Sequence, residues 1–165
     1  MPRIRQVHPK TRLLLVGGHP SPDLASLAGP GVTITGVVAD VAPYYQQADI
    51  ALAPLRAGGG TRLKILEAMA RGRPVVSTSL GAEGLDVTHG RDLLLADTPK
   101  ELAAAVLTLF GKPTLRAEIR AHARALVESR YNWDRCVREH LELYERLTEA
   151  RRLKGPSRQR TAHIW

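Results

Sequence analysis

Short apolar runs alternate with turns and amphipathic segments over the first hundred residues of the chain. Five runs have the length and composition of buried strands, and they cover residues 12–16, 32–36, 49–55, 75–78 and 93–96. Helical spacing of apolar residues separates most of these runs. This alternation predicts an α/β fold, doubly wound and Rossmann-like, around a parallel sheet.

Helix start and stop signals place the segments between the strands. Ser21 before Pro22 and Asp40 before Val41 are typical N-caps. A helix over residues 61–71 is predicted to end at Gly72 and to turn four side chains inward, namely Leu63, Ile65, Leu66 and Ala70. Residues 81–84 are expected to form a tight loop.

From Lys100 onward the spacing of apolar residues is helical throughout, which predicts C-terminal helices with a break at residues 131–132. We expect one domain over residues 1–149 and a basic, disordered tail over residues 150–165. Five of the 24 lysines and arginines and none of the acids lie in this tail. Such a tail can contact nucleic acid or anionic lipid, but it is more often a solubilising end.

Composition narrows the class of protein. The chain has 165 residues, a formal net charge of +8 and a single cysteine, so an internal disulfide is excluded and a reducing compartment is favoured. No apolar run approaches the roughly 20 residues that span a bilayer. We therefore expect a cytoplasmic protein, one that contacts the inner face of a membrane peripherally if at all, with nucleic acid an unlikely partner.

The glycine-rich loop of residues 58–60 carries the most specific signal for chemistry. Thr61 follows it, and Arg62 and Lys64 then fall at the predicted start of a helix. Cations are disfavoured at that end of a helix, because the helix dipole is positive there. An anion bound to the exposed N–H groups of the loop would remove this conflict. The pattern indicates a phosphate or diphosphate site, although solvated cations after a glycine turn are also common.

Other turns support a nucleotide-binding edge. Right-handed crossovers bring the carboxyl ends of parallel strands to one edge of a sheet, and Gly17 and Gly18 follow the first predicted strand. Glu67 would accept hydrogen bonds from ribose there, or pair with Arg71 one turn later. Glu83 would bind a sugar hydroxyl or cap the next turn. Motifs of metal hydrolases, serine hydrolases and P-loop ATPases are absent, and no metal site is expected.

Residues 54–78 together with 15–18, 32–40, 44–49, 81–85 and 131–133 resemble the C-terminal, donor-binding half of the retaining family-4 (group 1) glycosyltransferases, which have the GT-B fold. The resemblance covers about residues 2–147. It implies hexosyl transfer from a UDP- or GDP-linked sugar, without a further cofactor, to a glycan or lipid-linked acceptor, as in polysaccharide biosynthesis. The diphosphate leaving group would be stabilised by Arg62 and Lys64. The implied donor contacts are Gly17, Gly18, Gly58, Gly59, Gly60, Thr61, Leu63, Glu67 and Glu83.

Two departures from the family pattern qualify this resemblance. The family often has two glutamates eight positions apart, and the first would fall at Gly59, so only the second is matched, by Glu67. Residues 1–8 resemble the end of the helix that follows the first strand of the donor domain, so we expect that strand and the acceptor-binding N-terminal domain to be missing from this sequence. We therefore expect a truncated fold whose catalysis needs an N-terminal domain in trans. The alternative is a module that binds the nucleotide or nucleotide-sugar without turnover.

Overall fold

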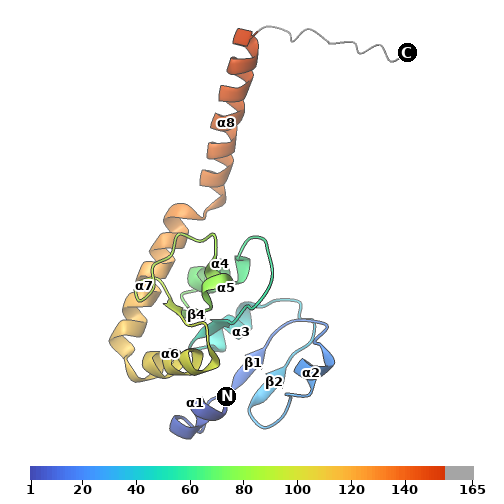
Figure 1. The fold of residues 1–165 in the computed structure, drawn as a ribbon, viewed down its shortest axis with the longest axis vertical. Coiled ribbons are helices and arrows are strands. Elements are labelled where there is room, and N and C mark those ends of the chain that lie inside the picture. Colours follow the sequence, from blue (N-terminus) through green and yellow to red (C-terminus); the bar gives the residue numbers. More distant parts are fainter. Residues whose placement is uncertain (155–165) are drawn as a thin grey trace, which may run out of the picture. The chain divides into compact units, whose positions relative to one another are not determined.

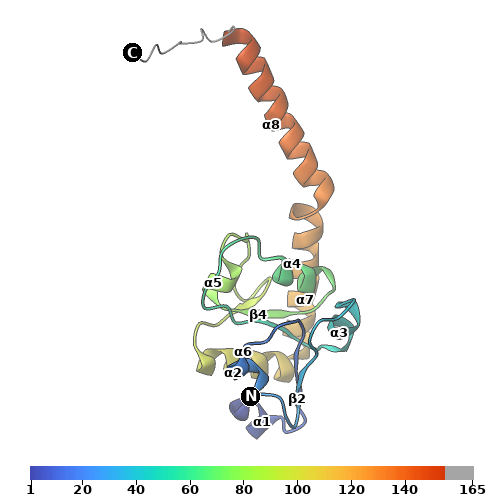
Figure 2. The same ribbon diagram turned by 90° about the vertical axis from the view of Figure 1, so that its right-hand side faces the viewer.

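The computed structural model describes residues 1–154, and its strands and helices follow the predicted order (Figures 1 and 2). The chain divides into two compact units. The first, Met1–Glu128, holds all the described strands, and the second begins at Ser129 and holds the long helix α8, Trp133–Lys154. Helix α7, Pro113–Arg130, ends just inside the second unit.

The first unit has a Rossmann-like α/β fold, which confirms the predicted class. Its parallel strands form two sheets among the described residues. In one, β1 (Leu13–Leu15) pairs with β2 (Val32–Ile34), with Leu14 opposite Thr33. In the other, β4 (Val75–Ser77) lies between β3 (Ala51–Ala53) and β5 (Leu94–Leu95). β1 and β3 do not pair, so the described strands lie in two sheets and not in one continuous sheet.

The strands are shorter than the apolar runs that predict them. β3 ends at Ala53 because Pro54 has no N–H to donate to a ladder, and the Leu55 N–H donates instead to the Ala53 carbonyl, 2.9 Å away. The apolar residues next to the strands differ in burial, since Leu93 before β5 is fully buried and Val16 after β1 is 37% exposed.

Helices connect the strands and cover the second sheet. Before α7 they are α1 (Pro2–Val7), α2 (Pro22–Ala25), α3 (Ala42–Gln47), α4 (Leu63–Ala70), α5 (Ser79–Ala82) and α6 (Pro99–Gly111). Ser21 caps α2 as predicted, since its hydroxyl accepts the Leu24 N–H at 3.3 Å. The N-cap of α3 is Val41, one residue later than predicted, although the Asp40 carboxylate accepts the Ala42 N–H at 2.8 Å.

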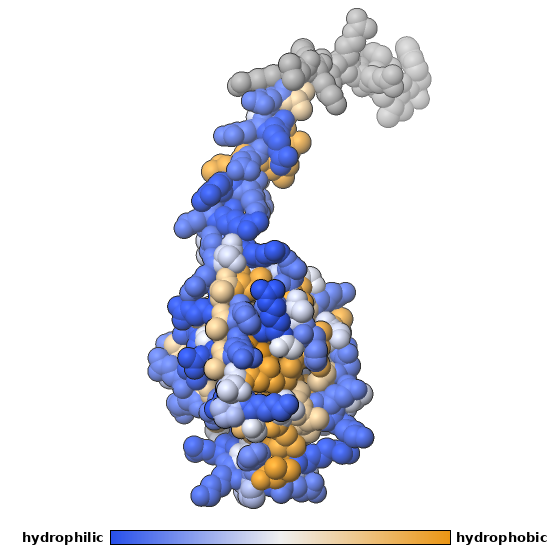
Figure 3. All heavy atoms as spheres, turned by 90° about the vertical axis from the view of Figure 1, so that its left-hand side faces the viewer, coloured by the Kyte–Doolittle hydropathy of each residue, from blue (hydrophilic) through white to orange (hydrophobic). Residues whose placement is uncertain are grey.

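The core lies between the second sheet and helices α1, α6 and α7. Val76 and Leu94 face the apolar stripe of α6, and Ile4 of α1 joins them. The fully buried Ile119 brings α7 onto the same core. Figure 3 shows that the visible face of this unit is mostly hydrophilic, with apolar side chains exposed near its middle.

The predicted inward face of α4 is wrong in part. Ile65, Ala68 and Met69 are buried, whereas Leu63 is 65% exposed and Ala70 is exposed. Spacing of three and four residues joins Ile65, Ala68 and Met69 into one stripe. The prediction placed this stripe a fraction of a turn away, because it gave Leu63 more weight than Ala68 and Met69.

The C-terminal helices follow the prediction closely. The break falls at residues 131–132, between α7 and α8. Helix α8 continues to Lys154, so it passes through the expected domain boundary at residue 149, and this boundary stays a prediction. Residues 155–165, most of the expected tail, lie outside the described residues. No helix of the described part of the chain is long and apolar enough to cross a membrane.

Candidate functional site

The glycine loop leaves the carboxyl end of β3 and leads into α4. Gly58 and Gly60 have φ angles of 126° and 89°, which side chains rarely adopt. Gly59 has no such constraint, and a Cβ added there would meet nothing within 4 Å. The loop is exposed, so its backbone is open to a ligand, and only two of its three glycines are required by the backbone conformation.

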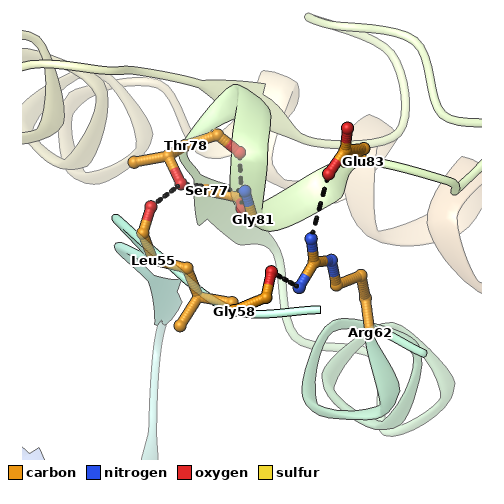
Figure 4. A network of polar contacts seen from close by, with 7 residues as sticks. All are labelled: Leu55, Gly58, Arg62, Ser77, Thr78, Gly81 and Glu83. Atoms are coloured by element: carbon orange, nitrogen blue, oxygen red, sulfur yellow. Dashed lines mark hydrogen bonds and ion pairs between the residues drawn. The ribbon is translucent and has the colours of Figure 1, made fainter. Parts of the chain in front are cut away.

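Arg62 lies at the N-cap of α4 and points inward, whereas the sequence predicted a cation in the first helical turn. Its side chain is only 6% exposed. The guanidinium Nη1 donates to the Gly58 carbonyl at 3.2 Å, and Nη2 donates to Glu83 Oε2 at 3.3 Å (Figure 4). The Nε N–H is buried and has no hydrogen-bond partner among the residues that the structure describes, which is rare and costly for a charged group.

Glu83 ends the short helix α5 and connects it to the loop through Arg62. Its side chain is 68% exposed, so one carboxylate oxygen binds Arg62 while the group remains in contact with solvent. The predicted tight loop of residues 81–84 is therefore a helical turn followed by Glu83. A role for Glu83 toward a sugar hydroxyl stays a prediction.

A second set of hydrogen bonds holds the loop in place, and sequence reasoning missed it. The Thr78 hydroxyl donates to the Leu55 carbonyl at 2.6 Å and accepts the Gly81 N–H at 3.0 Å (Figure 4). A Cβ on Gly81 would come within 2.9 Å of three oxygen atoms, including the Ser77 hydroxyl. The serine and threonine that end the strand before α5 were a readable N-cap signal.

Lys64 is the exposed cation at the start of α4. It makes no ion pair among the residues that the structure describes, and Thr61 and Leu63 beside it are also exposed. The Tyr45 hydroxyl donates to the Lys64 carbonyl at 3.4 Å. The ammonium group is therefore available to an anion that binds at the glycine loop.

Glu67 forms the ion pair that the sequence gave as the alternative to ribose binding. Both Nε and Nη2 of Arg71 donate to Glu67 Oε1 at 3.2 Å, and the Arg71 guanidinium lies over the Tyr45 ring. Burial, followed by the charge of Glu67, raises the pKa of Tyr45. No described residue donates to Oε2 of Glu67, so this oxygen can still accept a hydrogen bond, and the ribose role stays a prediction.

Gly17 and Gly18 lie at the carboxyl end of β1, next to the turn after β2. The Gly17 N–H donates to the Thr35 hydroxyl at 3.4 Å, and a Cβ on Gly18 would collide with the Val37 side chain. Local packing thus explains Gly18 without a ligand. No described contact links these two glycines to the loop of residues 58–60.

The arrangement defines the class of site. A glycine loop at the carboxyl end of a parallel strand, a buried arginine and an exposed lysine at a helix N-terminus are typical of phosphate binding in α/β proteins. No group of three or more His, Cys, Asp or Glu side chains gathers among the described residues.

Comparison with known proteins gives the family. The model of the family described as glycosyl transferases group 1 matches residues 1–112, and the chain belongs to this family. The chain is 28% identical over 147 residues to an uncharacterized glycosyltransferase of Methanocaldococcus jannaschii, covering 84% of this chain and 38% of that protein. It is 30% identical over 152 residues to the phosphatidyl-myo-inositol mannosyltransferase of Mycobacterium leprae, covering 88% and 40%.

The fold comparison agrees. The crystal structure of Anabaena HepE in complex with UDP superposes with a TM-score of 0.75 and 23% identity, covering 90% of this chain and 43% of that one. The described fold is therefore shared with GT-B glycosyltransferases. The chain spans about two fifths of the length of these relatives.

Proposed function

We propose that this chain is the donor-binding half of a glycosyltransferase, which transfers a hexosyl group from a nucleotide-diphospho-sugar. The observation that carries the proposal is Arg62. Its charged side chain is buried at the start of α4, with its Nε N–H unpartnered among the described residues, directly beside a glycine loop whose backbone is open. A diphosphate on the loop would add a second negative charge beside this arginine, which Glu83 already pairs.

We infer a different role in donor binding for each of these residues. N–H groups of the loop and the Lys64 ammonium would bind the diphosphate, and a preorganised site of this kind stabilises the charge that develops on a leaving group. Arg62 would hold the Gly58 carbonyl and the Glu83 side chain in position. Its positive charge, buried beside the loop, would add to the attraction for the diphosphate. Glu67, through Oε2, would accept a hydrogen bond from the ribose.

The relatives support the choice of ligand and acceptor. HepE was crystallised with UDP and, separately, with UDP-glucose, so a UDP-linked donor is the first to test, with GDP second. The mannosyltransferase of M. leprae carries a lipid in its name, which supports a lipid-linked or glycan acceptor. The acceptor would be held by an N-terminal domain, acting in the same protein or in trans, in the cytoplasm or at the inner face of a membrane.

Calorimetric titration of UDP tests the proposal. We expect Lys64→Ala and Arg62→Ala each to weaken binding by about 1–3 kcal/mol, the range for charge-assisted hydrogen bonds. Lys10→Ala is the matched control, since Lys10 is exposed in a turn away from the loop. Arg62→Lys guards against loss of folding at the buried position. Unchanged affinity for UDP and GDP in both Lys64→Ala and Arg62→Lys would refute the assignment.

A further inference from the structure

A second group of cations lies where β3 and β4 begin, whereas the glycine loop follows the end of β3. Two adjoining hollows of about 200 and 350 Å³ open there between α7 and the turn that connects α4 to β4. Both are lined by Gly72, Arg73 and Arg120. We define the arginine groove by the five arginines that line these hollows: Arg71, Arg73, Arg116, Arg120 and Arg124. Asp49 is the one acid in the lining of the two hollows.

The helix side of the groove carries a like-charge stripe. Arg116, Arg120 and Arg124 are spaced four residues apart, so they share a face of α7, and the buried Ile119 and Ala123 lie on a different face. Like charges at this spacing destabilise a helix. Arg124 is relieved by Glu128, whose Oε1 is 2.7 Å from its Nε. Arg116 and Arg120 make no ion pair within residues 1–154.

The turn side supplies a buried, unpartnered donor. Arg73 Nη1 donates to the Ala48 carbonyl at 2.9 Å, but its Nε N–H is buried with no partner within residues 1–154. Arg120 reaches the same turn, because its Cδ would lie 3.8 Å from a Cβ added to Gly72. Arg71 is already paired with Glu67. Arg73, Arg116 and Arg120 make no ion pair among the described residues, and they line the first hollow with Asp49 as the single acid beside them.

We propose that the arginine groove is a phosphate-binding site, separate from the candidate donor site. Guanidinium groups bind phosphate oxygens in pairs of parallel hydrogen bonds, and several converging arginines favour a phosphate over a single carboxylate. A bound phosphate would relieve the repulsion along α7 and place a negative charge beside the Arg73 guanidinium. The ligand is a phosphorylated compound, either free in solution or as the headgroup of an anionic phospholipid. The proposal does not depend on the function proposed for the glycine loop.

Titration of pyrophosphate into the whole chain tests this proposal, with the Lys64→Ala substitution present to weaken the candidate donor site without disturbing a buried residue. We expect Arg116→Glu and Arg120→Glu each to weaken the groove component of binding at least about tenfold, as for a lost charge-assisted contact. Arg3→Glu is the matched control, because Arg3 is exposed on α1 outside the groove. It makes the same change in net charge and is expected to alter binding less than twofold.

A parallel arm distinguishes the two sources of phosphate. The same variants are mixed with phosphatidylcholine vesicles that contain phosphatidylglycerol, and bound protein is measured by flotation. Binding to vesicles that Arg120→Glu abolishes and Arg3→Glu preserves identifies a lipid headgroup; sensitivity confined to pyrophosphate identifies a free compound. The proposal is overturned if the groove variants and Arg3→Glu have equal effects in both arms, or if neither arm shows binding that the groove variants reduce. Circular dichroism of each variant, compared with the parent chain, verifies folding.

Discussion

Individual glycines of the loop have separable roles, because the backbone needs two of them and a ligand would need the third. At Gly60 a side chain must adopt a positive φ, so Gly60→Ala is expected to lower the free energy of unfolding by about 1–2 kcal/mol. Gly59→Ala has open space and an unconstrained backbone, so it should leave stability unchanged or slightly raised. Urea denaturation measures both changes.

Gly59→Ala, which should not lower stability, is expected to lower the affinity for UDP. If a diphosphate approaches the backbone at Gly59, the added methyl group in Gly59→Ala obstructs it, and calorimetry should show weaker UDP binding by a chain that is fully stable. A Gly59→Ala variant with unaltered affinity would move the diphosphate away from this part of the loop.

Glu67 tests which part of the nucleotide lies over α4. Glu67→Gln keeps the size of the side chain but removes its charge, and it leaves Arg71 without its ion-pair partner. We expect affinity for UDP to fall by about 1–2 kcal/mol, the scale of a hydrogen bond to a charged group, while affinity for pyrophosphate, measured with Arg120→Glu present to weaken the arginine groove, is unchanged. Parallel titrations of the two ligands measure this difference. Equal losses for both would place Glu67 near the phosphates or restrict its role to Arg71.

The residue scale also shows where sequence reasoning reached its limit. The glycines and cations at 58–64 could be selected from the sequence, because their types conflict with the helix dipole. The inward direction of Arg62 could not be predicted, since it depends on Glu83, which lies 21 residues away, directly after α5. The arginine groove could not be predicted from the sequence for the same reason, because Arg73 and Arg120 come together only when α7 packs onto the core.

At the scale of the element, the hydrogen bonds at the start of α6 stabilise the fold to an extent that depends on pH. The Thr98 hydroxyl accepts the Glu101 N–H at 3.2 Å, while Glu101 Oε2 accepts the N–H groups of Asp97 and Thr98, which makes a capping box. These hydrogen bonds, first the one from the Thr98 N–H, lower the pKa of Glu101. Hydrogen bonds from Ser79 lower the pKa of Asp97 beside it.

A lowered carboxyl pKa sets the sign of the pH dependence. The stabilisation is fully present above the ordinary pKa of about 4 and is lost as the pH falls through the lower, folded-state value. We therefore expect the free energy of unfolding to fall between about pH 5 and pH 2, and to fall less in Glu101→Gln. Urea denaturation across this range measures the slope. Glu118→Gln, on the exposed face of α7, is the control and should keep the slope of the parent chain.

Elements were predicted better than their boundaries or their pairing. Periodicity identified the strands and the three long C-terminal helices, because burial imposes it on the sequence. It did not indicate that β1 and β3 would remain unpaired, since pairing depends on what lies between two strands in space. Nor did it place the buried stripe of α4, because Leu63, Ala68 and Met69 are all apolar and only the packing decides among them.

For the whole molecule, the chain spans about two fifths of the length of its relatives, and the candidate site occupies one edge of one unit. In a two-domain transferase the donor and the acceptor meet between domains, and holding both in a reactive geometry can supply roughly 7–11 kcal/mol of the barrier. The site proposed here is the donor side of such an interdomain cleft. Donor binding and transfer should therefore separate in this chain.

We expect the purified chain to bind UDP but to transfer sugar to an acceptor at no more than the background rate. The measurement is release of UDP from UDP-glucose, with and without a glycan or lipid-linked acceptor, by the chain alone and after addition of a separately produced N-terminal half from a relative. Lys64→Ala provides the control, because any transfer restored by the added half must be lost when the donor site is weakened. Binding without restored transfer would favour the nucleotide-binding module. Multiple turnovers by the chain alone would show that one domain suffices to hold both reactants.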